Sequence, residues 1–593
     1  AQLVACAVTR ATLRSAFALF VLAAQGPSGA PPPAAEDFHA SYGEWAVAAD
    51  QTLASQAGAE ILAAGGNAAD AAAATMLALG VVNPASSGMG GGGFLLYYEA
   101  SSGELTFLDF RERAPAAATP DMFEEAPSPV EGPANRASQV GGLASGVLGE
   151  PAGVAEMVRR FGRLPLGRVV GPAARYAEEG VPVSEPVSRM SGYFAAQMKR
   201  DAVMSGWFAE GAEALAPGQR LVQPELGQTL RAFGRGGARA IYRGRIAREI
   251  VRANRAVGGL FTVEDLAAYE VKEREPLEGT HFGHRWVTAP PPSAGGFTML
   301  QSLAILEQIP ERHRPVAEGD RPCPAFLHAL AESWKGPFLD RQRYFGDPDH
   351  VELYLDRMMA PERIEARAGA FHPTLAMPAA DYDQPLFPEE DAVHQSDNAG
   401  TSHLCVVDGE GNVAAVTTTV NLPFGARYTA AGIVMNDEMD DFASAIGEMN
   451  AFGLPGGAPN LPGPGKRPIS SMTPTSVFGP DGLPALCAGA AGGSRIVTAT
   501  QQVALHHLVF GMALGEALAA PRVHHQGAPD QLRTENVMPM DDERIAALVA
   551  RGHAHEPIRN IANAQVISIV REGDEVTLTA ASDPRKGGRP AGR

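Results

Sequence analysis

The sequence is poor in cysteine and in positive charge, and it has no long apolar run after its first 34 residues. Its 593 residues include 4 cysteines, and 48 Lys and Arg stand against 67 Asp and Glu, which gives a formal net charge of −19. Nucleic-acid binding needs clustered positive charge, so this balance argues against a polyanionic partner. No run in the rest of the chain suits a membrane span, and no fixed-period repeat is visible. A content of 45% hydrophobic and 19% charged residues is typical of a globular protein with a large core.

The cysteines are scattered along the chain at Cys6, Cys323, Cys405 and Cys487. They form no Cys-x-x-Cys pair, which argues against a zinc or redox motif. We therefore expect no disulfide framework, and we predict that the cysteines are small, buried, apolar residues.

The N-terminal segment is typical of an exported protein. Arg10 and Arg14 precede the short apolar run "SAFALFVLAA" and a spacer rich in Pro and Ala. This order predicts a signal peptide and spacer over residues 1–34, and hence a periplasmic or secreted protein. "LVAC", ending at Cys6, resembles a lipoprotein cleavage site, but almost no charged or apolar segment precedes it.

Helical and strand patterns then interleave, which predicts a mixed α and β fold. "QTLASQAGAEILAAGG" ends on two glycines like a helix C-terminus, and Asn67 with Asp70 supplies the N-cap and first-turn acid of a second helix. Two consecutive helices are predicted there.

A glycine-rich stretch follows these helices. Gly88, Gly90 and Gly93 satisfy the spacing G-x-G-x-x-G, but the predicted strand at 94–98 comes after the glycines, whereas a dinucleotide site needs strand, glycines and then helix. We reject a nucleotide site and expect close backbone approach to another segment.

Histidines also occur in groups, at 506–507, at 524–525 and at 553–555 with a following Glu. Adjacent histidines point in different directions, and none of these groups has the i, i+4 pairing with an acid that a zinc-binding helix presents. We therefore predict no metal site and no cofactor.

Residues 402–407 and 413–420 are β-branched and apolar, and "DGEGN" between them has the composition of a turn, which predicts a hairpin. A five-residue loop at 408–412 pairs Val407 with Val413 and carries through to Thr401 opposite Thr419, with Asn421 on the same face. A four-residue loop would break this register.

The hairpin begins at a Gly-Thr junction that has an unusual chemical option. Cutting the bond between Gly400 and Thr401 would give Thr401 both a hydroxyl nucleophile and a free α-amine, whose pKa of about 8 suits a general base. An uncut Thr401 would simply begin an ordinary strand.

The chain resembles the gamma-glutamyltransferase (gamma-glutamyltranspeptidase) family of the N-terminal-nucleophile hydrolase superfamily. From about Val47 onward it contains "GGNAADAA", "LDFRERAP", "PPPSAGG", "GTSH", "NDEMDDF", "GKRPISSMTPT", "AGGSRI" and "APRVHHQ" in the family's order. The family usually reads Thr-Thr-His where this chain reads Thr401-Ser402-His403, so a hydroxyl is kept at the second position.

The resemblance implies a role for each matched residue. Self-cleavage would fall between Gly400 and Thr401, with Thr401 as nucleophile, Thr419 beside its amine, and the backbone of Gly492 and Gly493 as oxyanion donors. The residues implied for substrate binding are Arg111 for the α-carboxylate, assisted by Ser470 and Ser471, and Asn421, Glu438 and Asp441 for the α-ammonium. Arg113 is expected to be structural, and Phe452 stands on the implied lid where the family commonly has Tyr.

The implied fold is an α+β four-layer αββα sandwich built from two autoprocessed fragments, a large subunit of residues 35–400 and a small subunit of residues 401–593, which form a heterodimer. The implied activity is cleavage of γ-glutamyl amides such as glutathione, with transfer of the group to water or to amino acid and peptide amines. A glutaryl cephalosporin acylase of the same family is the enzymatic alternative, although a glutaryl group has no ammonium for Glu438 and Asp441. A catalytically silent binding protein is the other alternative.

Overall fold

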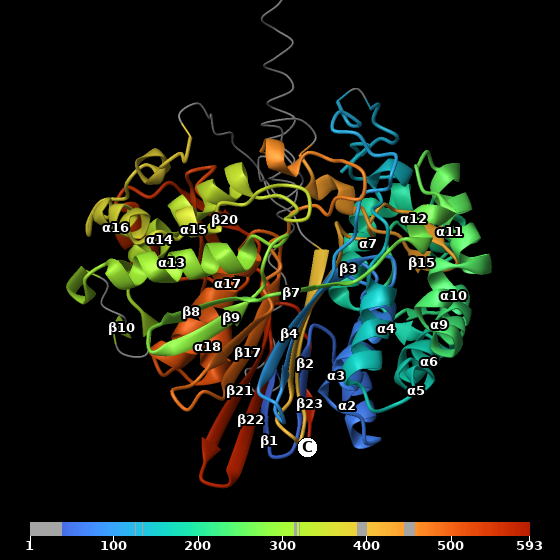
Figure 1. Ribbon diagram of the computed structural model, residues 1–593, viewed down its shortest axis with the longest axis horizontal. Coiled ribbons are helices and arrows are strands. Elements are labelled where there is room, and N and C mark those ends of the chain that lie inside the picture. The colour runs from blue at the N-terminus through green and yellow to red at the C-terminus, as the bar shows by residue number, and fades with distance from the viewer. Residues whose placement is uncertain are drawn as a thin grey trace, which may run out of the picture.

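The computed structural model describes residues 38–124, 126–132, 134–313, 317–318, 321–387, 400–443 and 457–593. Two seven-stranded antiparallel sheets lie at its centre (Figure 1). The first sheet has the order β1 (His39–Tyr42), β22 (Glu575–Ser582), β21 (Asn563–Glu572), β17 (Pro484–Ala491), β16 (Thr475–Phe478), β9 (His284–Thr288), β8 (Leu277–His281). The second has the order β23 (Ala591–Gly592), β2 (Ala46–Ala49), β12 (Gly400–Val407), β13 (Val413–Asn421), β3 (Gly92–Glu99), β4 (Glu104–Phe110), β7 (Lys272–Arg274).

Helices gather on two sides of these sheets (Figure 1). On the side of the second sheet lie α2 (Thr52–Ala63), α3 (Ala68–Val82), α4 (Glu150–Phe161), α5 (Leu166–Val169), α6 (Gly171–Glu179), α7 (Glu185–Met198), α9 (Pro224–Gly236), α10 (Ala238–Tyr242), α11 (Gly244–Ala256) and α12 (Val263–Ala267). On the side of the first sheet lie α13 (Gly295–Gln308), α14 (Pro324–Tyr344), α15 (Leu355–Met358), α16 (Pro361–Gly369), α17 (Arg495–Ala504) and α18 (Leu514–Ala519). A further helix, α19 (Asp542–Val549), packs against α14.

Short strands complete the architecture. β18 (Val523–His524), β19 (Leu532–Glu535) and β20 (His555–Ile558) form a three-stranded sheet in which β19 and β20 run parallel. Two-stranded pairs are formed by β5 (Val181–Pro182) with β6 (Arg220–Leu221), by β10 (Ala317–Glu318) with β11 (Arg321–Pro322), and by β14 (Thr429–Ala430) with β15 (Ile433–Val434). No helix in the described part of the chain is long and apolar enough to cross a bilayer.

The alternation of side chains along β12 divides the hydrophobic core. Leu404 and Val406 belong to the core shared with α2 and α3, whereas Cys405 and Val407 belong to the core shared with the first sheet. Successive side chains of a strand point to opposite faces, so one short run of apolar residues serves both cores. This explains why the run "LCVV" is apolar throughout rather than alternating with polar residues.

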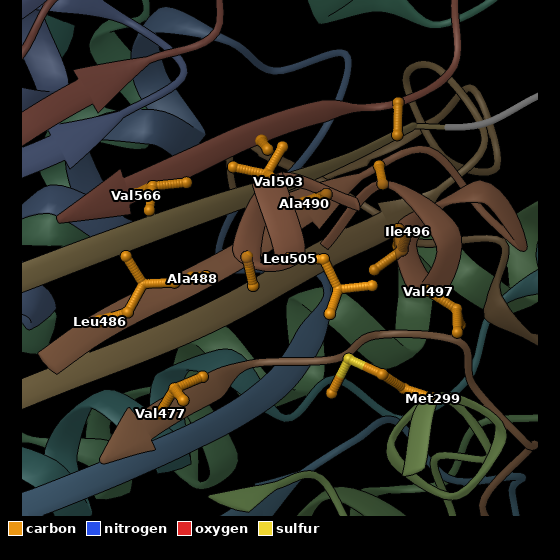
Figure 2. Packing of buried hydrophobic residues seen from close by; sticks show 14 of the residues in the cluster. Met299, Val477, Leu486, Ala488, Ala490, Ile496, Val497, Val503, Leu505 and Val566 are labelled. Atoms are coloured by element: carbon orange, nitrogen blue, oxygen red, sulfur yellow. The ribbon is translucent and has the colours of Figure 1, made fainter. Parts of the chain in front are cut away.

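The first sheet uses the same alternation on β17. Leu486, Ala488 and Ala490 pack with Val503 and other apolar residues of α17 on one face, as Figure 2 shows. The intervening Cys487 and Gly489 face the opposite way, toward β12.

The expectation that the cysteines form no disulfide is wrong for one pair. Cys405 of β12 and Cys487 of β17 are joined by a disulfide with a Cα–Cα distance of 6.0 Å, and Cys323 is buried. The two partners are 82 residues apart and lie on strands of different sheets, so no local spacing marks them as a pair. Cys6 lies outside the described residues.

Several local predictions are confirmed. The two consecutive helices are α2 and α3, and Asn67 and Asp70 form a reciprocal capping box at the start of α3. The glycines after α3 allow close packing, because a Cβ on Gly90 would overlap the carbonyl oxygen of Val434. The predicted strand at 94–98 lies within β3.

Candidate active site

The Gly400–Thr401 junction lies at the start of β12 and is buried. Thr401 Oγ1 donates to the Gly400 carbonyl oxygen at 2.7 Å, and Thr419 Oγ1 donates to the same oxygen at 2.8 Å. The two threonine hydroxyl oxygens are 3.4 Å apart. One carbonyl is thus polarised by two hydroxyls, which makes its carbon a better electrophile.

The predicted pairing of β12 with β13 holds along most of the hairpin and changes near Thr401. Val407 pairs with Val413 and Cys405 with Ala415 across the predicted loop. A bulge before Ser402 then shifts the register, so that Gly400 rather than Thr401 takes a ladder position, and the predicted Thr401–Thr419 ladder pair is wrong. Bulges re-aim side chains in this way, and the two hydroxyls still meet.

The backbone around the junction is closely confined. A Cβ on Gly400 would lie 2.8 Å from the Asn421 carbonyl oxygen and 2.9 Å from that of Ala85, so only glycine fits without displacement. On the other side Lys586 Nζ donates to the Thr401 carbonyl oxygen at 3.2 Å and forms an ion pair with Asp50. Sequence reasoning missed Lys586, which lies 185 residues from Thr401 with no local pattern to link them.

Two contacts between the sheets set the position of β17 relative to Thr401. Cys405 is bonded to Cys487, and the ring of His403 covers Gly489, where a Cβ would overlap the ring. Two residues back along β12, from Cys405 to His403, therefore correspond to two residues forward along β17, from Cys487 to Gly489. β17 ends at Ala491, two residues beyond Gly489, and Gly492 and Gly493 follow it directly.

The two glycines have the conformation and position of a backbone donor site. Their φ values are 149° and 61°, in the region that favours glycine, and α17 begins two residues later. Within the described residues neither N–H has a hydrogen-bond partner. Unpaired N–H groups at a helix N-terminus favour negative charge.

A group of buried charges lies around Arg111, which directly follows β4. Its guanidinium forms an ion pair with Glu438, lies 2.5 Å from Asp441 Oδ2, and donates to the Ile469 carbonyl oxygen at 2.8 Å. Glu438 and Asp441 belong to one 3₁₀ turn, which brings both carboxylates to the same guanidinium. The cation and the anions that the resemblance implies for opposite ends of a substrate therefore neutralise one another here.

Arg341 of α14 is a second buried cation that sequence reasoning missed. Its Nη2 donates to Ser471 Oγ at 3.1 Å, whereas its Nε and Nη1 have no partner among the described residues. Ser470 Oγ instead accepts the Met472 N–H at 3.1 Å, so the structure brings only one of the two serines to an arginine side chain. An arginine in the middle of a long helix carries no signal that would separate it from a surface charge.

Unpaired acceptors lie in the same region. Asn421 donates through Nδ2 to the Asp437 carbonyl oxygen at 2.9 Å, but its Oδ1 has no partner among the described residues, and the same holds for Glu438 Oε2. Buried polar atoms are normally satisfied, so unpaired ones require an explanation such as a bound ligand.

Burial sets the protonation of this region. It raises the pKa of the Glu112 carboxyl, next to Arg111, above its usual range. Burial also raises the pKa values of Glu438 and Asp441, against the lowering effect of the Arg111 charge. It lowers the pKa of Arg341 to about 10, which still leaves this arginine charged at neutral pH.

Of the residues that remain from the sequence predictions, the structure describes Arg113 but not the others. Arg113 forms a bridge to Val147 and donates to the Asp265 carbonyl oxygen at 3.3 Å, away from the carboxylates that Arg111 binds. Phe452 lies outside the described residues, as do residues 1–34.

Comparison with known proteins gives a consistent result. The protein-family model described as Gamma-glutamyltranspeptidase matches residues 54–593. A "Glutathione hydrolase proenzyme" from Escherichia coli (strain K12) is 36% identical over 542 residues, covering 91% of this chain and 90% of the relative. The protein of the same name from Pseudomonas aeruginosa is 36% identical over 552 residues, covering 92% of this chain and 94% of the relative. A solved structure of cephalosporin acylase from Bacillus halodurans superposes with a TM-score of 0.79 at 26% identity, covering 96% of this chain and 99% of that one.

Proposed function

The chain belongs to the gamma-glutamyltranspeptidase family, and we propose that it cleaves γ-glutamyl amides such as glutathione and transfers the γ-glutamyl group to water or to an amine. It is therefore an enzyme, a gamma-glutamyl hydrolase and transferase. The observation that carries the substrate assignment is the set of unpaired polar atoms around Arg111. Donors and acceptors without partners among the described residues occur in this buried region, and an amino acid headgroup needs both kinds.

The α-amino acid end of a γ-glutamyl donor matches these atoms in charge. Its ammonium has three donors, and Asn421 Oδ1 and Glu438 Oε2 are unpaired acceptors that suit it, with the Asp441 carboxylate as a third acceptor. Its carboxylate suits the forks of Arg111 and Arg341, the second of which has unpaired Nε and Nη1 groups beside Ser471. Ligand binding would exchange the internal ion pairs of Arg111 for ion pairs with the substrate.

We assign the nucleophile to Thr401, activated by its own amine. After cleavage between Gly400 and Thr401, the free α-amine takes the hydroxyl proton as Oγ1 bonds to the γ-carbonyl carbon, and the Gly492 and Gly493 N–H groups bind the oxyanion. Collapse expels the donor's amine, which takes that proton and leaves a γ-glutamyl ester on Thr401. Water or an acceptor amine then attacks the ester and gives a proton to the α-amine, which passes it to Oγ1 as the γ-glutamyl group leaves.

The same hydroxyl would carry out maturation. Thr401 Oγ1 attacks the Gly400 carbonyl carbon, the amide nitrogen leaves as the Thr401 amine, and water hydrolyses the resulting ester. The hydrogen bond of 2.8 Å from Thr419 to the Gly400 oxygen supports this step, because it stabilises the negative charge that develops there. The products are a large subunit ending at Gly400 and a small subunit beginning at Thr401, held together as a heterodimer.

The two stacked sheets and their flanking helices favour the αββα sandwich of N-terminal-nucleophile hydrolases. The contact of β12 with β17 through the disulfide supports stacking of the two sheets, and the separate cores with α3 and with α17 support one helical layer on each side. The disulfide also favours an oxidising compartment, in agreement with the predicted signal peptide and a periplasmic or secreted location.

A glutaryl acylase is the second candidate, favoured by the structural similarity to cephalosporin acylase. A glutaryl group offers a carboxylate to the arginines but leaves Asn421 Oδ1 and Glu438 Oε2 without a donor. Unpaired buried acceptors cost about 1–3 kcal/mol each, which favours the γ-glutamyl substrate.

The intact mass of purified protein tests maturation. We expect two polypeptides, the smaller beginning Thr-Ser-His-Leu and containing 193 residues (593 − 400). Thr401→Ala should remain one inactive chain, and Thr419→Ala should mature slowly. A wild-type protein that is uncut and fully active would refute the mechanism, because an amide nitrogen is no base.

A further inference from the structure

A buried polar cluster on α14 lies outside the site described above. His328 and Glu332 are separated by one helical turn and lie on the same face of α14, and His553 comes from the segment between α19 and β20. Their exposed fractions are 0%, 1% and 5%. One ligand atom from each lies within 4.8 Å of the others. The i, i+4 pairing that the clustered histidines lack is therefore present on α14, completed by a residue distant in sequence.

Hydrogen bonding determines the tautomer of His328. Its Nε2 lies 2.8 Å from the His372 carbonyl oxygen, which only accepts, so Nε2 carries the proton. Its Nδ1 therefore presents a lone pair, directed at His553 Nε2 at a distance of 2.7 Å. A backbone carbonyl that binds the far nitrogen of an imidazole is the usual support for a metal-ligating histidine.

Both rings are neutral over the working pH range. Burial lowers the pKa of His328 to about 4 and that of His553 to about 2, so neither competes for protons at neutral pH. Neutral imidazole is the form that binds metal ions.

The carboxylate of Glu332 is held by hydrogen bonds on one side and by an ion pair with Lys335 on the other. Its Oε2 accepts from Met377 N at 3.0 Å and from the Tyr382 hydroxyl at 2.6 Å. Its Oε1 receives no hydrogen bond of good geometry, although Lys335 Nζ lies 2.7 Å away. Lys335 also lies 3.4 Å from Asp530, so one lysine faces two carboxylates. A dication is compatible with two carboxylates beside one lysine, and Asp530 is 39% exposed.

We propose that His328 Nδ1, His553 Nε2 and Glu332 Oε1 bind one divalent transition-metal ion of the zinc type. Two imidazoles and one carboxylate form a ligand set that zinc accepts, with a water molecule as a fourth ligand. On binding, the hydrogen bond between the two rings is lost, and the proton of His553 Nε2 moves to Nδ1. The ion pair of Lys335 with Glu332 is lost, and its ion pair with Asp530 remains.

The ligands come from both sides of the Gly400–Thr401 junction. His328 and Glu332 precede it, and His553 follows it. If the chain is cleaved as proposed, the ion would join the two subunits noncovalently; this consequence rests on the proposed function, whereas the metal site itself does not.

Metal binding is tested on chelator-stripped mature protein titrated with Co²⁺ and with Zn²⁺ alone. We expect one ion per heterodimer and visible ligand-field bands for Co²⁺. His328→Gln and His553→Gln should each weaken binding by at least about tenfold, whereas His350→Gln, on an exposed histidine near Asp347, should change nothing. Lys335→Met should tighten binding, because it removes the cation that competes for Glu332.

The uncut Thr401→Ala protein separates the two proposals, since it should bind the metal as tightly as the mature protein does. Absence of binding in both wild type and Lys335→Met, with activity and circular dichroism intact, would overturn the site. Equal affinity in wild type and in both His variants would overturn it as well. Either result would make the cluster a hydrogen-bonded packing network.

Discussion

Replacing Asp441 by Asn separates the γ-glutamyl assignment from the glutaryl alternative. Asp441 is 12% exposed and lies 2.5 Å from the Arg111 guanidinium, so its carboxylate is the more accessible of the two that bind this arginine. Asn keeps the shape and one carbonyl oxygen but removes the charge. What is lost toward a γ-glutamyl donor is chiefly the ion pair with the substrate ammonium.

The size of the effect follows from the burial of the pair. Truncating one partner of a buried charge pair costs about 2–5 kcal/mol, and Glu438 remains as a second anion, so we take about 2–4 kcal/mol. This corresponds to a fall in kcat/KM of about 30- to 1000-fold. A glutaryl amide has no cation to lose, and Arg111 without Asp441 is freer to bind its carboxylate, so hydrolysis of this amide should stay level or rise.

The assay compares kcat/KM on γ-glutamyl and glutaryl versions of one chromogenic amide and follows their ratio. Asp440→Asn is the matched control, because Asp440 accepts from the Ser138 hydroxyl at 2.6 Å and serves a structural contact. That variant should leave the ratio unchanged. If wild type already prefers the glutaryl amide, or if Asp441→Asn lowers both substrates equally, the assignment of Asp441 to the ammonium is refuted.

Three further substitutions test other parts of the site. Arg111→Lys keeps the charge but not the planar fork that reaches Glu438 and Asp441 together, so kcat/KM should fall by at least about tenfold with maturation intact; unchanged kinetics would transfer the clamp to Arg341. Gly400→Ala adds a Cβ 2.8 Å from the Asn421 carbonyl oxygen. The strain from this overlap costs about 1–3 kcal/mol, which should slow self-cleavage by about tenfold or more in a time course on gels. Normal maturation would show that the junction relaxes freely. Replacing Cys405 and Cys487 together by Ser, in the uncut Thr401→Ala background, should lower the free energy of unfolding by about 2–4 kcal/mol in a denaturant titration; an unchanged midpoint would mean that the disulfide is absent in solution.

Local chemistry made part of this fold and site predictable from sequence. The cap at Asn67, the hairpin loop at 408–412 and the close packing of the glycines after α3 each depend on residues within a few positions of one another. The meeting of Thr401 with Thr419 also follows from hairpin pairing, although the bulge that aims the two hydroxyls does not. A register read from alternation assumes a regular ladder, and an inserted residue leaves no mark in the pattern.

Residues brought together from distant segments were beyond such reasoning. Arg341, Lys586 and the disulfide partners carry no local signal, because their side chains meet through packing of one element on another. The resemblance implied Arg111, Glu438 and Asp441, but it did not imply that they pair with one another before a substrate arrives. That pairing is a consequence of burial, since an isolated ion of either sign is too costly to leave unpaired.

The disulfide is one of the contacts that set the position of the two sheets relative to one another. Strands of one sheet are held in register by backbone hydrogen bonds, but two stacked sheets have only side-chain contacts to set their relative position. On β12 and β17 this position is set by a covalent bond at Cys405 and by a ring on a glycine at His403, both within four residues of Thr401. If Thr401 is the nucleophile as proposed, a slip by one residue between the sheets would move Gly492 and Gly493 relative to it. Cys405 and His403 both face the first sheet, so the strand that carries the proposed nucleophile Thr401 also carries the contacts that align it.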